Sequence, residues 1–396
     1  MTASARNEHQ LLFASSQALH QIDQWDSPSL LETQIDWQYI YSQAIQHRTV
    51  PLLQYFLKTH PEYLVPEKIT TEIDQYVHRQ ALANIFQTNE LLRILSRFES
   101  EHIDAIPFKG PVLGMHLYGQ LSYRAFGDLD ILIHREDFFK VKEILLEMGY
   151  LPFRKLSKQK EAAFLDTQMG YEFVRQDERC VIEIHWSLLS RVHAFNIPDN
   201  ELWSSKKTLE IQNKLVSTLD DKHLFIYLCA HGTKSFWARL RWISDIAEMI
   251  SLKSKNPEVL KWWSSVLHLA DSYNSVRMVH LGIYLAHQLL NAPVPKEILK
   301  AASEDKNVLF LFNRVLSALF VPPEQKKSVL KPISFHLSMR ERFKDKKPYL
   351  SHVFKLWFFP SKKDEAFLKL PTQLSFLYVL VKPFRIASRV LSKKAR

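Results

Sequence analysis

Glycine is scarce in this chain, with 8 residues among 396. Globular proteins average about 7% glycine. Tight hairpin turns and bulges depend on that residue, so a large all-β fold is excluded. The two cysteines, Cys180 and Cys229, are too few for a disulfide framework. Their number and the polar start MTASARNEHQ, which lacks the apolar segment of a secretory signal, favour a cytoplasmic protein.

Long apolar runs are also missing. No stretch of about 18 apolar residues occurs, so the sequence predicts no membrane-spanning helix. There is no cysteine/histidine spacing typical of zinc sites, and no Gly-x-x-x-x-Gly-Lys loop typical of P-loop enzymes.

Basic charge is concentrated near the C-terminus. The net charge is +10, yet residues 321–396 hold 18 Lys/Arg against 5 Asp/Glu. The first 320 residues are therefore slightly acidic, and we expect no extended nucleic-acid footprint. Residues 361–396 mix basic and aromatic side chains, as segments on an anionic membrane surface do. Three interpretations are open for this segment: peripheral membrane association, contact with an acidic partner, or simple packing on the helical domain.

Apolar residues at helical spacing dominate the chain on both sides of a short mixed segment. We predict an N-terminal helical region over 1–100, an α/β core over 101–215 and a C-terminal helical domain over 216–320. A helical tail interrupted by seven prolines follows over 321–396. The fold class is thus α+β and predominantly helical, with a small mixed sheet.

The core segment contains six of the eight glycines. Alternating or short apolar runs predict strands over Ile103–Phe108, Asp128–His134, Tyr171–Arg175 and Cys180–Trp186. A helix is expected over Asp137–Met148, since a glycine follows it directly.

Three acidic residues in these strands point to metal chemistry. Asp128 and Asp130, two positions apart, should share one face of a strand. Their mutual repulsion is relieved by a divalent cation such as Mg²⁺. Glu183 lies mid-strand between apolar neighbours, where a charge is costly unless it is paired or metal-bound. Three carboxylates on neighbouring strands are typical of two-metal phosphoryl or nucleotidyl transfer. A structural ion pair is the alternative for Glu183, and a hydrogen-bonded strand histidine is the favoured interpretation of nearby His185.

A phosphate-binding element is expected at Lys109-Gly110, where a strand ends and a helix begins. The glycine permits close backbone approach, and the free N–H groups at a helix N-terminus bind anions. Lys109 and Arg124 add positive charge, although a solvated loop lysine would have the same sequence.

A further set of polar residues recurs at steps of three and four, which predicts one stripe along a single helix. Its members are His231, Lys234, Ala238, Arg241 and Asp245. Either this stripe is a solvated face, or it crosses the catalytic cleft and brings Lys234 or Arg241 to the nucleotide or acceptor.

Together these motifs resemble the uncharacterised bacterial nucleotidyltransferase family of the DNA polymerase β-like superfamily. The resemblance spans about residues 35 to 290 and depends on Lys109-Gly110, Arg124, Gly127-Asp128-Leu-Asp130, Glu183-Ile-His185-Trp186 and Leu240-Arg241-Trp242. It implies transfer of a nucleoside monophosphate from an NTP such as ATP, with Mg²⁺ or Mn²⁺ as cofactor. Many superfamily members carry Gly-Ser after the first strand, where this chain has Lys109-Gly110-Pro111.

The resemblance implies catalytic and metal-binding roles for Asp128, Asp130 and Glu183. The helix N-terminus and the polar stripe described above make Lys109, Gly110, Arg124, Lys234 and Arg241 the candidates for nucleotide binding. The acceptor is a small molecule, a peptide or protein, or an RNA end. Two other functions fit the same motifs: a nucleotide-binding scaffold with weakened catalysis, and a toxin that nucleotidylates its target.

Overall fold

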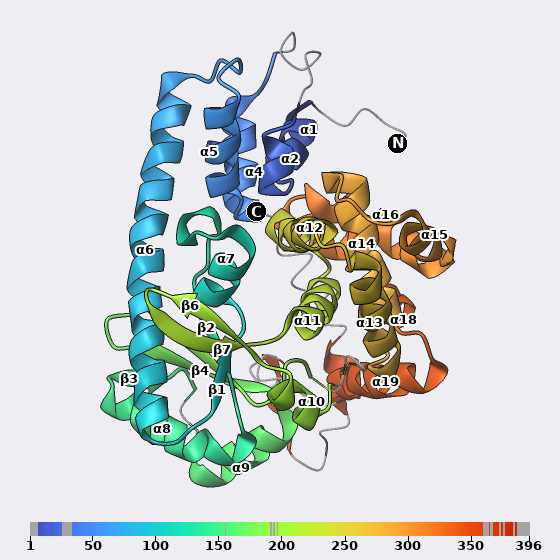
Figure 1. The fold of residues 1–396 in the computed structure, drawn as a ribbon. Coiled ribbons are helices and arrows are strands. Elements are labelled where there is room, and N and C mark those ends of the chain that lie inside the picture. The colour runs from blue at the N-terminus through green and yellow to red at the C-terminus, as the bar shows by residue number, and fades with distance from the viewer. Residues whose placement is uncertain are drawn as a thin grey trace.

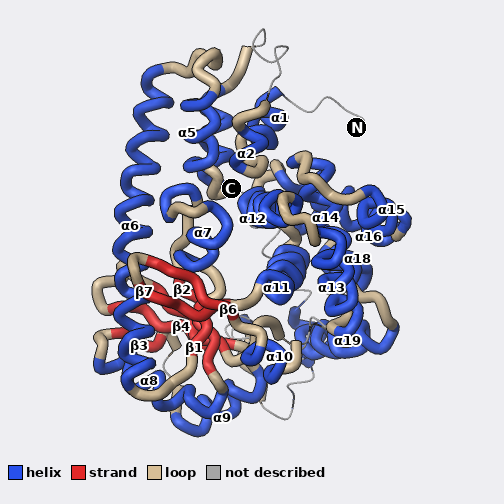
Figure 2. The backbone as a smooth tube through the Cα atoms, in the orientation of Figure 1, coloured by secondary structure: helices blue, strands red, loops and turns tan. Residues whose placement is uncertain are grey.

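The structure is a computed structural model that describes residues 7–25, 34–154, 156–190 and 197–358. Beyond these ranges it describes positions 192, 195, 364, 367–371, 374, 377–382 and 385. Helices form most of the described chain, and the strands gather at one end of the molecule (Figures 1 and 2). The predicted α+β class, predominantly helical with a small mixed sheet, is confirmed. The predicted domain boundaries stay predictions.

The N-terminal helices lead into one very long helix. They are α1 (Asn7–Ala14), α2 (Leu19–Ile22), α4 (Trp37–His47), α5 (Val50–Thr59) and α6 (Glu67–Ser100). The 34 residues of α6 run from these helices to the sheet along one side of the molecule (Figure 1). At its sheet end, Leu91, Ile94 and Phe98 of α6 are buried in the core beneath the strands.

The five-stranded sheet has the order β1-β2-β5-β4-β3. Its strands are β1 (Ala105–Pro107), β2 (Leu129–Ile133), β3 (Tyr150–Pro152), β4 (Gly170–Arg175) and β5 (Val181–His185). Only the β2–β5 pair within this sheet is parallel. The four predicted strands therefore exist: β1, β2 and β5 are slightly shorter than expected, and β4 begins one residue earlier, at Gly170. Connecting segments include α7 (Gly110–Tyr118), η1 (Leu121–Tyr123), η2 (Arg135–Asp137), α8 (Phe138–Glu147) and α9 (Lys158–Thr167).

One face of the sheet is apolar, as the strand alternation requires. Leu129, Ile131, Ile182, Ile184 and Phe173 are buried in one core with α8 and the end of α6. The alternate residues of β2, β5 and β4 therefore share the other face, where Asp130, Glu183 and Glu172 stand side by side in register.

A second sheet lies outside the sequence prediction. Strands β6 (Lys207–Ile211) and β7 (Lys214–Thr218) form an antiparallel hairpin after α10 (Asp199–Ser204). Its two-residue turn, Gln212-Asn213, has positive φ at both positions, 50° and 62°. This geometry matches the right-handed twist of a hairpin, but glutamine and asparagine replace the usual glycine.

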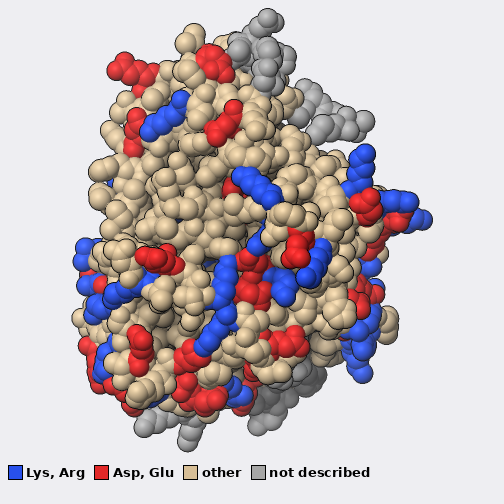
Figure 3. Space-filling view, viewed as in Figure 1, with Lys and Arg blue, Asp and Glu red and all other residues tan. Residues whose placement is uncertain are grey.

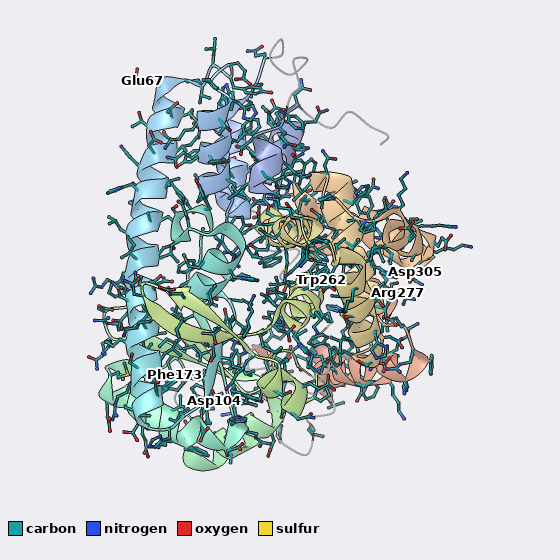
Figure 4. The ribbon with its side chains drawn as sticks, viewed as in Figure 1. Glu67, Asp104, Phe173, Trp262, Arg277 and Asp305 are labelled. Atoms are coloured by element: carbon teal, nitrogen blue, oxygen red, sulfur yellow. The ribbon has the colours of Figure 1, made fainter. Side chains whose placement is uncertain are left out.

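The C-terminal helices pack around α14. They are α11 (Asp221–Lys234), α12 (Leu240–Ser254), α13 (Val259–Ser272), α14 (Val276–Leu290), α15 (Lys296–Glu304) and α16 (Lys306–Leu319). Arg277 of α14 pairs with Asp305 at 2.7 Å, and both are labelled in Figure 4. The same guanidinium donates to the carbonyl of Arg340 at 2.8 Å. It thereby ties the following helices, α17 (Pro323–Leu330), α18 (Pro332–Ser338) and α19 (Phe343–Phe358), to the bundle.

The prediction that one helix carries the whole polar stripe is wrong. The chain turns sharply between α11 and α12 because Phe236 and Trp237 both adopt left-handed φ values, 58° and 49°. The Trp237 amide donates to the Gly232 carbonyl at 2.8 Å. Its buried ring lies where a side chain on Gly232 would need to be, 2.5 Å from an added Cβ. Lys234 and Arg241 consequently belong to different helices.

Within the described part of the chain, no helix has the length and apolarity needed to cross a membrane. The basic, aromatic segment predicted over 361–396 falls largely outside the described residues. On the face in Figure 3, Lys/Arg and Asp/Glu side chains are interspersed rather than segregated by sign.

Candidate metal and nucleotide site

Three side chains from two neighbouring parallel strands meet on the polar face of the sheet. Asp130 of β2 stands beside Glu183 of β5, and His185 is two positions further along β5. Ligand atoms of the three residues all lie within 4.8 Å of one another. The alternation that buries Leu129 and Ile131 on the opposite face brings these polar groups together.

Asp130 has two carboxylate oxygens in different surroundings. Its Oδ1 accepts from Lys109 Nζ at 3.0 Å and lies 3.1 Å from His185 Nε2. Its Oδ2 is buried and has no hydrogen-bond partner in the described structure. The residue as a whole is 2% exposed, so Oδ2 is a desolvated acceptor, which costs free energy unless a ligand satisfies it.

Charges within the site stabilise one another. Burial alone would raise the pKa of Asp130, but the Lys109 ammonium and the His185 hydrogen bond outweigh it and lower that pKa. His185 Nε2 also lies 3.4 Å from Glu183 Oε2. Burial opposes a charge on His185, yet its two carboxylate neighbours raise its pKa. Asp130 is therefore ionised, and protonation of His185 is favoured.

Lys109 is held tightly at the edge of the site. Its Nζ lies 5.4 Å from the ring centroids of both Phe108 and Tyr227, within the range of a cation–π contact. The Phe108 amide donates to the Asp130 carbonyl at 3.2 Å, which fixes the backbone next to the lysine. Although burial disfavours the ammonium, Asp130 raises the pKa of Lys109, which therefore stays positively charged.

Gly110 begins α7 in a left-handed conformation, with φ of 56°. A Cβ at this position would lie 3.2 Å from the backbone oxygen of Asp128. Glycine is thus needed here both for the conformation and for the close approach of the two segments. The N-terminus of α7 is thereby placed next to the strand that carries Asp130.

Asp128 does not join the cluster. Regular pairing of β2 begins at Leu129, and Asp128 precedes it as an exposed residue. Among the described residues, the group that could hold a metal consists of Asp130, Glu183 and His185. The expected convergence is therefore seen for Asp130 and Glu183. His185 is a hydrogen-bonded strand histidine, as favoured from the sequence, and it stands beside both acids.

Arg124 and Arg241 are occupied by internal partners. Arg124 is 3% exposed and binds Asp245 through Nε and Nη2, with distances of 3.0 to 3.2 Å. Tyr118 donates to the same carboxylate at 3.1 Å. Arg241 is also buried and donates to the carbonyl of Ala125. These contacts join the segment after α7 to α12, and they direct the N–H groups of Arg124 toward Asp245 rather than toward a nucleotide.

Lys234, near the end of α11, lies within electrostatic range of the cluster. Burial is the main cause that lowers the pKa of Lys234, and the Lys109 ammonium lowers this pKa further. Glu183 and Asp130 act in the opposite direction. Tyr227 of the same helix faces Lys109. Sequence reasoning missed Tyr227 because it has no charge and lies among apolar neighbours.

Glu172 is a second residue that the sequence reasoning missed. It is exposed on β4 and stands directly opposite Glu183. Both glutamates line a cleft of about 140 Å³ whose other walls are Arg154, Phe164, Gln168, Met169, Gly170 and Tyr171. An added Cβ on Gly170 would lie 3.1 Å from His185 Nδ1, so this glycine leaves room beside the cluster. The sequence did contain a signal for Glu172: it lies between the apolar residues Tyr171 and Phe173, and this alternation predicts that it stands on the polar face of the strand.

The residues fit a hard divalent cation. Asp130 Oδ2 is an unsatisfied, buried carboxylate oxygen, and Glu183 supplies a second carboxylate from the neighbouring strand. Oxygen donors of this kind suit Mg²⁺ and Mn²⁺.

The fold and the cluster together define an α+β protein with a carboxylate-rich site on a small mixed sheet. Residues 33–291 match the family described as uncharacterised nucleotidyltransferase. This match spans most of the chain, which therefore belongs to that family, and the resemblance of its motifs to an uncharacterised nucleotidyltransferase family is confirmed.

One solved structure with similarity is that of an antigenic nucleotidyltransferase-like protein from Paracoccidioides brasiliensis. It is 15% identical, and the alignment covers 50% of this chain and 90% of that chain, with a TM-score of 0.26. No curated protein matches the chain.

Proposed function

We propose that this chain transfers a nucleoside monophosphate from a nucleoside triphosphate to a hydroxyl or phosphate group of an acceptor, with Mg²⁺ or Mn²⁺ as cofactor. The observation that carries the proposal is the pairing of Asp130 with Glu183 beside one unsatisfied, buried carboxylate oxygen. Membership of a nucleotidyltransferase family supports the same reaction class.

Asp130 and Glu183 would hold the cation. When bound, a divalent cation neutralises triphosphate charge and helps to activate the attacking oxygen. The positive end of α7 at Gly110 and the Lys109 ammonium attract the triphosphate. Lys234 lies close enough to the cluster to contribute a third positive group.

The cleft beside Glu183 is the proposed entrance for the acceptor. The acids become more exposed from β2 to β4. The Asp130 side chain is 1% exposed, that of Glu183 is 26% exposed, and Glu172 lies on the surface. An acceptor hydroxyl entering over β4 would reach Glu183 before Asp130. Glu172 is placed to accept a hydrogen bond from it.

Labelling tests this proposal. Purified protein is incubated with each α-³²P-labelled NTP, Mg²⁺ or Mn²⁺ and a cell extract, and the labelled product is identified. Asp130→Asn and Glu183→Gln should abolish labelling. Glu178→Gln, at the exposed turn between β4 and β5, is the matched control. Equal labelling by the wild type and both site variants would refute the assigned roles.

A second candidate is nucleotide binding without turnover. The Lys109–Asp130 ion pair favours it, because the ammonium already neutralises the acid that a catalytic cation needs. In that case calorimetry would detect NTP binding while no extract component acquires label. The nucleotidylating toxin stays a third alternative, which growth arrest cancelled by Asp130→Asn would identify.

A further inference from the structure

The two oxygens of Asp130 differ in a way that bears on how many cations the site takes. Oδ1 faces Lys109 Nζ at 3.0 Å, whereas Oδ2 is buried without a partner in the described structure. A carboxylate shared between two divalent ions ordinarily offers each of them an oxygen. Here only one of the two oxygens is open.

Three features fix Lys109 in this position. Its side chain is 16% exposed, and its ammonium lies between the Phe108 and Tyr227 rings. Its backbone leads directly into Gly110, whose left-handed φ is needed for the turn into α7. A solvated lysine would have neither the aromatic neighbours nor the buried carboxylate partner.

We propose that the site binds one divalent cation, at Asp130 Oδ2 and Glu183, and that the Lys109 ammonium supplies the second positive charge. This inference rests on the proposed function, because it specifies the cation count of the same site. It gives a physical role to the lysine that lies between β1 and α7.

Counting bound Mn²⁺ tests the proposal without any need for an acceptor. The protein is titrated with Mn²⁺ both without nucleotide and with one equivalent of a non-hydrolysable NTP analogue, because a second ion can enter with the triphosphate, and the free ion is followed by electron paramagnetic resonance. The wild type should bind one ion per chain. Lys109→Met leaves His185 Nε2 as the one neighbour of Oδ1 described above and removes a repelling charge, so the variant should bind a second ion or hold the first at least about tenfold more tightly.

Two controls accompany the count. Lys109→Arg keeps the charge and should keep one ion, and Lys206→Met removes a lysine that pairs with Asp104 elsewhere. Two ions on the wild type, or an unchanged number and affinity in Lys109→Met, would overturn the proposal. The wild-type count decides the question even if Lys109→Met fails to fold. No bound ion at all would refute the cation site itself, whereas one ion without NMP transfer would refute only the proposed function.

A separate observation concerns α19. Two large apolar side chains seven positions apart are exposed on one face of this helix: Phe343 (83%) and Leu350 (43%). Lys347 completes the same stripe, and these residues together with Ser351 line an open hollow. Tyr349 is buried at the other side of the helix, where the Arg340 guanidinium lies 4.4 Å from its ring centroid.

We propose that this face of α19 docks on an anionic lipid surface. Apolar side chains of this kind insert at the boundary between headgroups and acyl chains, and adjacent lysines attract acidic headgroups. Lys344, Lys346 and Lys347 lie on α19 beside the apolar stripe, and the surrounding residues 321–396 carry the chain's basic excess. Charge complementarity therefore selects an anionic bilayer over a neutral one.

Sedimentation with phosphatidylcholine vesicles, with and without phosphatidylserine, tests this surface. The wild type should bind the anionic vesicles at least about tenfold more tightly than the double variant Phe343→Ser/Leu350→Ser. Leu64→Ser/Leu260→Ser removes two exposed apolar residues elsewhere and should have no effect. Equal binding by the wild type and the α19 variant, or no wild-type binding, would overturn the lipid proposal. The lipid proposal would also be overturned if the protein failed to bind vesicles but was captured by an acidic protein.

Discussion

Replacing Arg124 with methionine separates a structural role from a nucleotide-binding role. In the structure the guanidinium makes three contacts of 3.0 to 3.2 Å with Asp245. The side chains of the two residues are 3% and 1% exposed. Methionine fills much of the same volume but removes the charge, so Asp245 would be left buried with only Tyr118 as its donor.

The expected cost is large. Breaking a buried ion pair by removing one partner typically destabilises a protein by about 3–5 kcal/mol, because the remaining charge has lost its compensation. That loss is a substantial fraction of a typical stability of about 5–15 kcal/mol. An exposed pair gives a contrasting scale: the Lys300 and Glu304 side chains pair at 3.8 Å while 76% and 66% exposed, and Lys300→Met should cost about 1 kcal/mol or less.

Urea unfolding followed by circular dichroism measures both variants, and Arg124→Met/Asp245→Leu completes a double-mutant cycle. The double variant should recover much of the lost stability, since it leaves no unpaired charge. NTP affinity per folded molecule should change little in Arg124→Met. A loss below about 1 kcal/mol together with a large loss of NTP affinity would refute the structural role and restore the original sequence hypothesis.

Three other substitutions test specific features of the fold. Gly110→Ala should cost about 1–2 kcal/mol in urea unfolding, because alanine is strained at positive φ, and its Cβ would crowd the Asp128 backbone; an unchanged midpoint would contradict this. Trp237→Ala should cost about 3–5 kcal/mol, since it empties the space above Gly232; wild-type stability would argue against the described turn. Burial raises the pKa of Glu248 to about 7. The folded state therefore retains a proton that the unfolded chain releases, and stability should fall by about 3 kcal/mol as pH rises from about 4.5 to 7. Glu248→Gln should remove this dependence, and an identical pH profile in both proteins would refute it.

The alternation of polar and apolar residues was enough to predict that Asp130 and Glu183 lie on one face of the sheet. In the run around Asp130 and in that around Glu183, polar residues alternate with isoleucine and leucine. Burying the apolar positions of both strands forces the acids onto one common face. The parallel register that sets Asp130 beside Glu183 is a tertiary property, but it required only that the two strands be neighbours.

The sequence did not predict two turns that depend on left-handed backbone conformations of non-glycine residues. The turn at Phe236-Trp237 contains neither glycine nor proline, so its sequence reads as continuous helix. What stabilises it is the fit of the Trp237 ring over Gly232, which only the packed structure contains. The hairpin at Gln212-Asn213 was missed for the same reason, since its left-handed turn uses residues that signal such turns weakly.

Positive charges were the least predictable part of the site. A sequence shows that Lys109 and Arg124 are basic, but the acid that each one meets is set by the fold. Arg124 meets an aspartate 121 positions away, whereas Lys109 meets one 21 positions away on a neighbouring strand. In a buried setting each cation must be satisfied by what lies within a few ångströms. The role of a basic residue is therefore decided by its nearest buried carboxylate: Asp245 directs Arg124 to stability, and Asp130 places Lys109 in the site.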